Sequence, residues 1–87
     1  MPYLGIRGTL GMANSRVYGL SDAEVQRISQ LFRPGPRIIE KDELVLYNAS
    51  MYVANQIEYH LGYRIIMCTH AGDDQLIWTM YKAGNKL

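Results

Sequence analysis

The pattern of hydrophobic and polar positions is clearest near the C-terminal end of this chain, where two mainly apolar runs lie close together. Two runs rich in Ile, Tyr, Trp, Met and Thr, Tyr63–Thr69 and Gln75–Tyr81, flank a stretch of small and acidic residues, 70–74. This arrangement is typical of a β-hairpin with a turn between its strands. Alternate side chains point to opposite faces of a strand, and both faces of these runs are apolar. We therefore expect each face of the hairpin to be covered.

The first run of the hairpin divides between the two faces in the same way. Strict alternation places Ile65 and Met67 on one face and Ile66 and Cys68 on the other. A single cysteine cannot form an internal disulfide, and a cysteine in a strand is usually a buried, reduced thiol. We expect that state for Cys68.

The N-terminal end also follows a strand pattern. Pro2–Leu10 reads as a strand with Leu4, Ile6 and Leu10 on one face and Tyr3, Arg7 and Thr9 on the other. Glycines recur within it, and such glycines often mark a bulge or the close approach of a ligand or another backbone. The favoured interpretation is a bent edge strand, followed by a turn at Gly11–Ser15 and a short strand at Arg16–Leu20.

The first helix has clear signals at both ends. Ser21 and Glu24 have the spacing of a capping box, in which each side chain bonds the other residue's backbone amide. Prolines at 34 and 36 stop the helix, because proline lacks a donor and disfavours helix in the residue before it. The apolar stripe between these signals comprises Val25, Ile28, Leu31 and Phe32.

The middle of the chain adds two short strands and a second helix. Arg37–Glu40 and Glu43–Tyr47 read as strands around a charged turn, unless they merge into one. Asn48 or Ser50 is expected to cap a helix that runs to Leu61, with Gly62 in the left-handed conformation after it. Its apolar stripe comprises Val53, Ala54, Ile57 and Leu61. The pattern predicts one α+β domain over 1–87, an antiparallel sheet with two helices on one face.

Composition narrows the function. A domain of 87 residues is only marginally stable alone, so oligomerisation is expected to add buried area. The net charge is +1 and the basic residues are scattered along the sequence, which argues against nucleic-acid binding. No secretory leader and no apolar run of about 18 residues is visible, so no membrane insertion is expected. We expect a cytoplasmic protein, and the nucleus stays open as a second compartment.

Catalytic and metal-binding motifs are not visible. The sequence has no phosphate loop, catalytic triad or paired-carboxylate motif. His60 and His70 match no zinc spacing, and two ligands are too few. We therefore expect neither enzymatic activity, metal nor cofactor. A weaker alternative is a small tautomerase, in which Pro2 would become an N-terminal base if Met1 were removed.

The two ends of the chain resemble the feedback regulatory protein of GTP cyclohydrolase I. The similar residues are Gly62-Tyr63-Arg64-Ile65-Ile66, Thr69, Gly72 and Leu76-Ile77-Trp78, together with Met1-Pro2-Tyr3-Leu4, Ile6 and Met12. Between residues 17 and 49 the likeness extends only to the type of each element. The resemblance implies a non-catalytic regulator that assembles as a homopentameric ring and docks on GTP cyclohydrolase I. In that family phenylalanine favours a stimulatory complex and tetrahydrobiopterin an inhibitory one.

The resemblance also implies where the effector would bind. In the family phenylalanine lies at the interface with the enzyme, near the first strand and the last hairpin turn. This hairpin is one residue longer, so the family's glutamine corresponds to Asp74 by spacing but to Gln75 by chemistry, and His70 replaces a glycine. By position, the expected effector and partner contacts are Thr9, Leu10, Ala71, Gly72, Asp73, Asp74 and Gln75.

An alternative function does not depend on that family. The chain would be a stand-alone amino-acid-binding module, with its ligand at a strand edge between its own subunits. That alternative predicts ligand binding without any enzyme, whereas a regulator would bind its effector mainly in the presence of the cyclohydrolase.

Overall fold

The computed structural model describes residues 3–9, 11–40, 43–70, 72 and 74–82. Within these residues the chain forms six strands and two helices. In chain order they are β1 (Tyr3–Thr9), β2 (Ser15–Tyr18), α1 (Asp22–Leu31), β3 (Arg37–Glu40), β4 (Glu43–Leu46), α2 (Ser50–Leu61), β5 (Arg64–His70) and β6 (Gln75–Tyr81). The predicted α+β class is confirmed, and Arg37–Glu40 and Glu43–Leu46 are separate strands.

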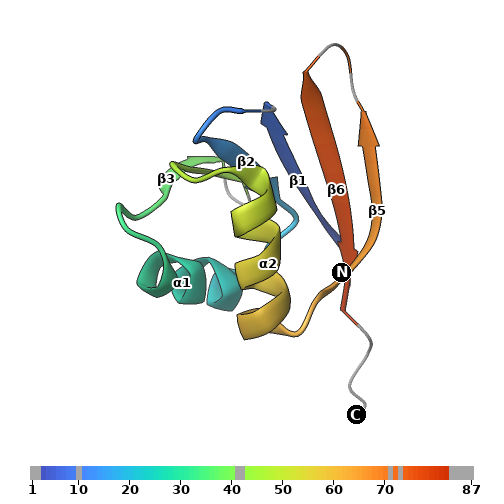
Figure 1. Ribbon diagram of the computed structural model, residues 1–87. Coiled ribbons are helices and arrows are strands. Elements are labelled where there is room, and N and C mark those ends of the chain that lie inside the picture. Colours follow the sequence, from blue (N-terminus) through green and yellow to red (C-terminus); the bar gives the residue numbers. More distant parts are fainter. Residues whose placement is uncertain (1–2, 10, 41–42, 71, 73, 83–87) are drawn as a thin grey trace.

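The strands form one antiparallel sheet in the order β3-β4-β2-β1-β6-β5. Both helices lie on the same side of it (Figure 1). β1 therefore lies inside the sheet, between β2 and β6, and the prediction that it is a bent edge strand was wrong. Within the described residues, neither helix combines the length and apolar character that crossing a membrane requires.

Two glycines of β1 explain why that strand can be central. A Cβ atom on Gly5 would lie 2.6 Å from the ring of Tyr18, and one on Gly8 would lie 2.5 Å from the Cβ of Ser50. Tyr18 therefore lies across β1 on one face, and helix α2 begins close against β1 on the other. The predicted close approach at these glycines is real, but the approaching groups belong to this chain.

The core lies between the sheet and the two helices. Alternate strand residues point into it, as predicted for Leu4 and Ile6, and the helices contribute their apolar stripes. Leu31 and Leu61, the last residues of the two helices, are only partly buried. The buried hydrophobic residues are Leu4, Ile6, Val17, Leu20, Ile28, Phe32, Leu44, Leu46, Val53, Ala54, Ile57, Tyr63 and Met80.

The start of α1 has the predicted capping box. The backbone N–H of Glu24 donates to the Ser21 hydroxyl at 3.3 Å, and the Ser21 N–H donates to the Glu24 carboxylate at 3.0 Å. The helix ends at Leu31, before the prolines, as expected. Gly62 follows α2 with φ of 79°, which confirms its left-handed position.

The predicted cap of α2 was wrong. Its N-cap residue is Ala49, which has no side chain to accept a hydrogen bond. The Ser50 hydroxyl instead accepts a hydrogen bond of 3.0 Å from the indole N–H of Trp78. Asn48 contributes its backbone carbonyl, which accepts from the Ser15 hydroxyl at 3.0 Å. The start of α2 therefore has no side-chain cap, and hydrogen bonds from strands β2 and β6 hold it against the sheet instead.

The hairpin of β5 and β6 contains a β-bulge that changes its faces. Ile65 pairs with Met80, but the next paired residue is Met67, opposite Thr79. Ile66 is the extra residue, so the predicted alternation of Ile65 with Met67 is broken. Cys68 falls on the helix side but is exposed, on the edge strand β5. The prediction of a buried thiol was therefore wrong.

The hairpin is also uncovered on its other face within this chain. Ile66 and Met67 are 54% and 59% exposed. The prediction that both faces are covered therefore fails for one chain alone.

Candidate functional site

The predicted contact residues from the two ends of the chain meet at one end of the sheet. Thr9 is the last residue of β1, Gln75 is the first of β6, and the two lie directly opposite each other. Gly72 and Asp74 precede Gln75 in the exposed hairpin turn. Gly72 has φ of 85°, a conformation that favours glycine. The other three predicted contacts, Leu10, Ala71 and Asp73, lie outside the described residues, as does Pro2.

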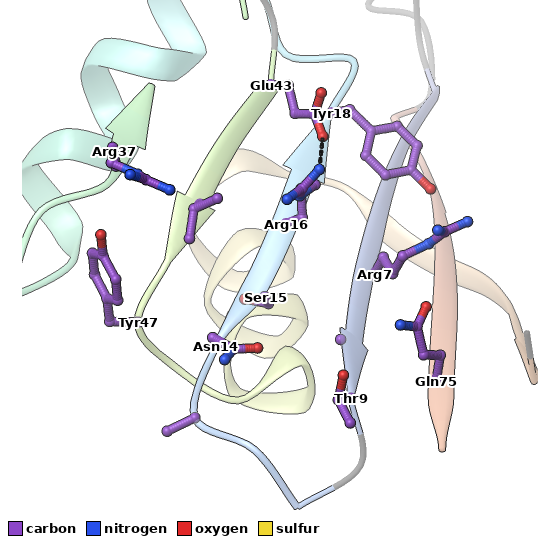
Figure 2. A pocket seen from close by; sticks show the side chains of 13 residues that line it. Arg7, Thr9, Asn14, Ser15, Arg16, Tyr18, Arg37, Glu43, Tyr47 and Gln75 are labelled. Atoms are coloured by element: carbon purple, nitrogen blue, oxygen red, sulfur yellow. Dashed lines mark hydrogen bonds and ion pairs between the residues drawn. The ribbon is translucent and has the colours of Figure 1, made fainter. Parts of the chain in front are cut away.

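Thr9 and Gln75 also form one side of an open trough on the face of the sheet that carries no helix. The trough has a volume of about 930 Å³ and extends across β1, β2 and β4 (Figure 2). This volume lies in the range of roughly 300 to 1,000 Å³ that is usual for small-molecule pockets. Unlike most such pockets it is mainly polar, and Asn14, Thr9 and Gln75 are among the residues that line it. A polar ligand is therefore favoured.

Three arginines form a row across this trough. Arg37 pairs with Val45, Val45 pairs with Arg16, and Arg16 pairs with Arg7. Residues directly opposite in a sheet share a face, so the three side chains lie on the same side. Figure 2 shows them in that order across the sheet. The basic residues are scattered along the sequence, but the register of the sheet gathers these three.

Among the residues that the structure describes, Glu43 is the only acidic one that lines the trough. Its carboxylate lies 3.2 Å from a guanidinium nitrogen of Arg16. Among the side chains that the structure describes, neither Arg7 nor Arg37 forms an ion pair. Of the described lining residues, three arginines and one glutamate are charged, which gives a sum of +2.

Two tyrosines border the arginine row. Tyr18 lies beside Arg7 on the neighbouring strand, and Tyr47, 43% exposed, follows β4 near Arg37 (Figure 2). Their rings offer flat apolar surfaces next to the guanidinium groups. The trough can therefore bind an anionic group at its centre and a planar group at either end.

Sequence reasoning singled out Thr9 and Gln75 but missed the arginine row. Arg7 was placed on the face opposite Leu4 and Ile6, which is correct. Arg16 and Arg37 could not be aligned with it, because alternation gives a face and not a register. Strand pairing alone joins these residues.

The described residues contain no group of three or more His, Cys, Asp or Glu side chains that could hold a metal ion. Cys68 and His70 do share one face of β5, since they pair with Trp78 and Leu76. Both are exposed. They therefore remain a pair without further ligands in the part of the chain that is described.

A scan of the chain against models of known protein families finds no match, and a search of curated proteins finds no relative. The function is therefore inferred from the geometry of the site and from the motifs at the two ends of the chain.

Proposed function

We propose that this chain is a non-catalytic regulator that docks on GTP cyclohydrolase I and responds to an amino-acid effector. The observation that carries this proposal is the direct pairing of Thr9 with Gln75 at one end of the sheet. These two positions were selected from opposite ends of the sequence by their resemblance to the feedback regulatory protein. Their adjacency is what an effector site between the first strand and the last hairpin turn requires.

The end of the sheet has suitable chemistry for an amino acid. The Thr9 hydroxyl and the Gln75 amide each provide a donor and an acceptor, and both side chains are partly exposed. Asp74, exposed in the adjoining turn, can pair with an effector ammonium. The site is open, so a docked enzyme would supply the remaining walls. That explains why effector binding would depend on the enzyme.

Self-association into a homopentamer is part of the same proposal. One face of the β5–β6 hairpin is apolar and uncovered, with Ile66 and Met67 more than half exposed. β3 and β5 are the two edges of the sheet, and each has one unpaired side. Different surfaces at opposite edges favour head-to-tail contacts, which close into a ring when the rotation between subunits allows it.

Native mass spectrometry of the chain, alone and with the GTP cyclohydrolase I of the same organism, tests this function. We expect a pentamer that joins the enzyme, with the amount of complex depending on phenylalanine. Leucine at the same concentration is the control for a nonspecific amino-acid effect. A chain that never associates with the enzyme, with phenylalanine, tetrahydrobiopterin or neither, would contradict the proposal.

The stand-alone amino-acid-binding module stays a second candidate, because the guanidinium group of Arg7 lines the same trough as Thr9 and Gln75. Arg7 lies on the same face of β1 as Thr9, and its guanidinium can pair with an effector carboxylate without a second protein. This candidate predicts that phenylalanine binds the isolated chain. Calorimetry without the cyclohydrolase therefore separates the two functions.

A further inference from the structure

The arginine row places like charges on adjacent strands of one sheet face. Arg7 and Arg16 are direct cross-strand partners, a position in which like charges are destabilising. Arg37 lies two strands from Arg16, roughly 10 Å away at the usual strand spacing. Only Arg16 has a carboxylate partner among the described side chains. Two guanidinium groups thus share one open trough without a compensating charge from the described residues.

From this arrangement we propose that the trough binds a small molecule through a phosphate group, held by Arg7, Arg16 and Arg37. An arginine guanidinium has five N–H donors in a planar fork, which matches the oxygens of a phosphate. Bound phosphate would place negative charge between the three groups and remove their mutual repulsion. The site needs no movement of the backbone, because the register of β1, β2, β4 and β3 already aligns the three side chains.

The charge of the trough favours phosphate over a single carboxylate. With Glu43 paired to Arg16, the charged side chains that the structure describes in the trough leave a charge of +2. A phosphate ester at neutral pH has a charge between about −1.5 and −2, whereas a carboxylate has −1. The phosphate therefore compensates both Arg7 and Arg37.

The uncharged residues indicate that the ligand is an organic phosphate. Asn14, Thr9 and Gln75 offer hydrogen bonds beyond the arginines, and the rings of Tyr18 and Tyr47 border the row. A volume of about 930 Å³ is far larger than inorganic phosphate requires. A phosphorylated small molecule with a polar or planar body fits this trough.

This inference does not depend on the proposed regulatory function. The arginine row requires neither the cyclohydrolase nor phenylalanine, although Thr9 and Gln75 border both sites. A chain that binds phosphate but never joins the enzyme would support this inference and contradict the regulatory function. A chain that joins the enzyme but binds no phosphate would contradict this inference and leave the regulatory function standing.

Isothermal titration calorimetry with inorganic pyrophosphate tests the site directly. Ionic strength is held constant with sodium chloride, since screening weakens any contact between exposed charges. We expect saturable binding to the wild-type chain. Arg7→Gln and Arg37→Gln should each weaken it by about 10-fold or more, because each removes a charge-assisted hydrogen-bonding group. Arg7→Lys should fall between wild type and Arg7→Gln, because it keeps the charge but loses the fork.

Arg27→Gln is the matched control. Arg27 is exposed on helix α1, on the other side of the sheet, and its replacement changes the net charge of the chain equally. It should leave pyrophosphate affinity unchanged, and circular dichroism should show that all variants fold. If Arg7→Gln does not fold, Arg37→Gln at the edge of the sheet gives the same test.

Two results would overturn the inference. One is the absence of saturable pyrophosphate binding, or an equal loss with Arg27→Gln, which would indicate only attraction to overall positive charge. The other is binding of phenylalanine, but not of pyrophosphate, that depends on Arg7. That result would assign the arginine to the carboxylate of an amino acid and favour the stand-alone module.

Discussion

The Tyr63 hydroxyl donates a hydrogen bond of 2.9 Å to the Glu24 carboxylate. Tyr63 lies between the end of α2 and the start of β5, whereas Glu24 lies in the first turn of α1, so the bond joins α1 to the segment that follows α2. The ammonium group of Lys82, just after β6, lies 2.7 Å from the same carboxylate oxygen and 4.9 Å from the centre of the Tyr63 ring. Glu24 therefore caps its own helix and also ties it to the end of the sheet.

Removal of the Tyr63 hydroxyl should destabilise the fold. Tyr63 is 1% exposed, and a hydrogen bond to a charged group contributes about 1.5 to 3 kcal/mol. Tyr63→Phe keeps the buried ring and should lower the free energy of unfolding by about that amount, measured by urea denaturation. Tyr59→Phe is the control, because Tyr59 is 82% exposed. Equal stability of the two variants would show that the Tyr63–Glu24 bond contributes little.

Glu24 should make the stability of the fold fall in acid. Burial acts to raise the pKa of its carboxyl group, but hydrogen bonds from Lys82, the Ser21 amide and Tyr63 lower it more, so the folded-state pKa lies below 4.5. Its stabilising contribution is fully present above the unfolded-state pKa and is lost as pH falls through the lower folded-state value.

Urea denaturation at a series of pH values from about 7 to 3 checks the acid dependence. The wild-type free energy of unfolding should decline below about pH 4.5, and Glu24→Gln should be less stable at neutral pH and decline less. Asp22→Asn is the control, since Asp22 lies in the same helical turn but is exposed. A decline as steep in Glu24→Gln as in wild type would assign the acid sensitivity to other carboxyl groups.

The space above Gly8 should tolerate no side chain. A Cβ there would lie 2.5 Å from the Cβ and 2.8 Å from the hydroxyl of Ser50, and that hydroxyl accepts the hydrogen bond from Trp78. Gly8→Ala should therefore destabilise the fold by about 1 to 3 kcal/mol, the usual cost of overpacking. Tryptophan fluorescence should change at the same time, because the indole loses its partner.

Gly35→Ala is the control for that substitution. A Cβ on Gly35 meets no atom within 4 Å, so the variant should keep the wild-type stability and fluorescence. A stable Gly8→Ala with unchanged fluorescence would mean that α2 can move away from β1.

The elements that the sequence predicted correctly are those with local signals. The capping box at Ser21 and Glu24 fixes the start of α1 whatever packs against it, and Gly62 ends α2 by its backbone conformation. The errors arise where a residue distant in sequence forms the hydrogen bond or contact that the local pattern assigned to a neighbouring residue. Ser50 was expected to cap its own helix, but its hydroxyl accepts from Trp78, a contact that exists only when β6 lies beside β1.

The candidate site likewise contains residues that local motifs predicted and residues that only strand pairing brings together. Thr9 and Gln75 could be selected because each lies in a recognisable motif at the end of a strand. The arginine row could not, because it depends on the pairing of β1 with β2 and of β2 with β4. The bulge at Ile66 is a further example. An extra residue in one strand changes which side chains share a face, and its amino-acid type gives no sign of it.

The exposed hairpin should determine the oligomeric state. Met67→Ser removes an apolar side chain that is 59% exposed on β5, and it should shift the chain from the proposed pentamer towards monomers. Size-exclusion chromatography with light scattering measures this. Met51→Ser is the control, since Met51 is also 59% exposed, but on helix α2. Dissociation by Met51→Ser alone would place the subunit contact on the helical side instead.

The Gln75 side chain should act in effector-dependent docking and not in the ring itself. Gln75 pairs with Thr9 through the backbone, so Gln75→Ala keeps the strand pairing and removes only the amide group. Complex formation with the cyclohydrolase should then become less dependent on phenylalanine, while native mass spectrometry still detects the pentamer. Gln56→Ala, at a partly exposed position on α2, should behave as wild type. If Gln75→Ala instead dissociates the pentamer, the amide is a structural contact between subunits, and the effector must bind elsewhere.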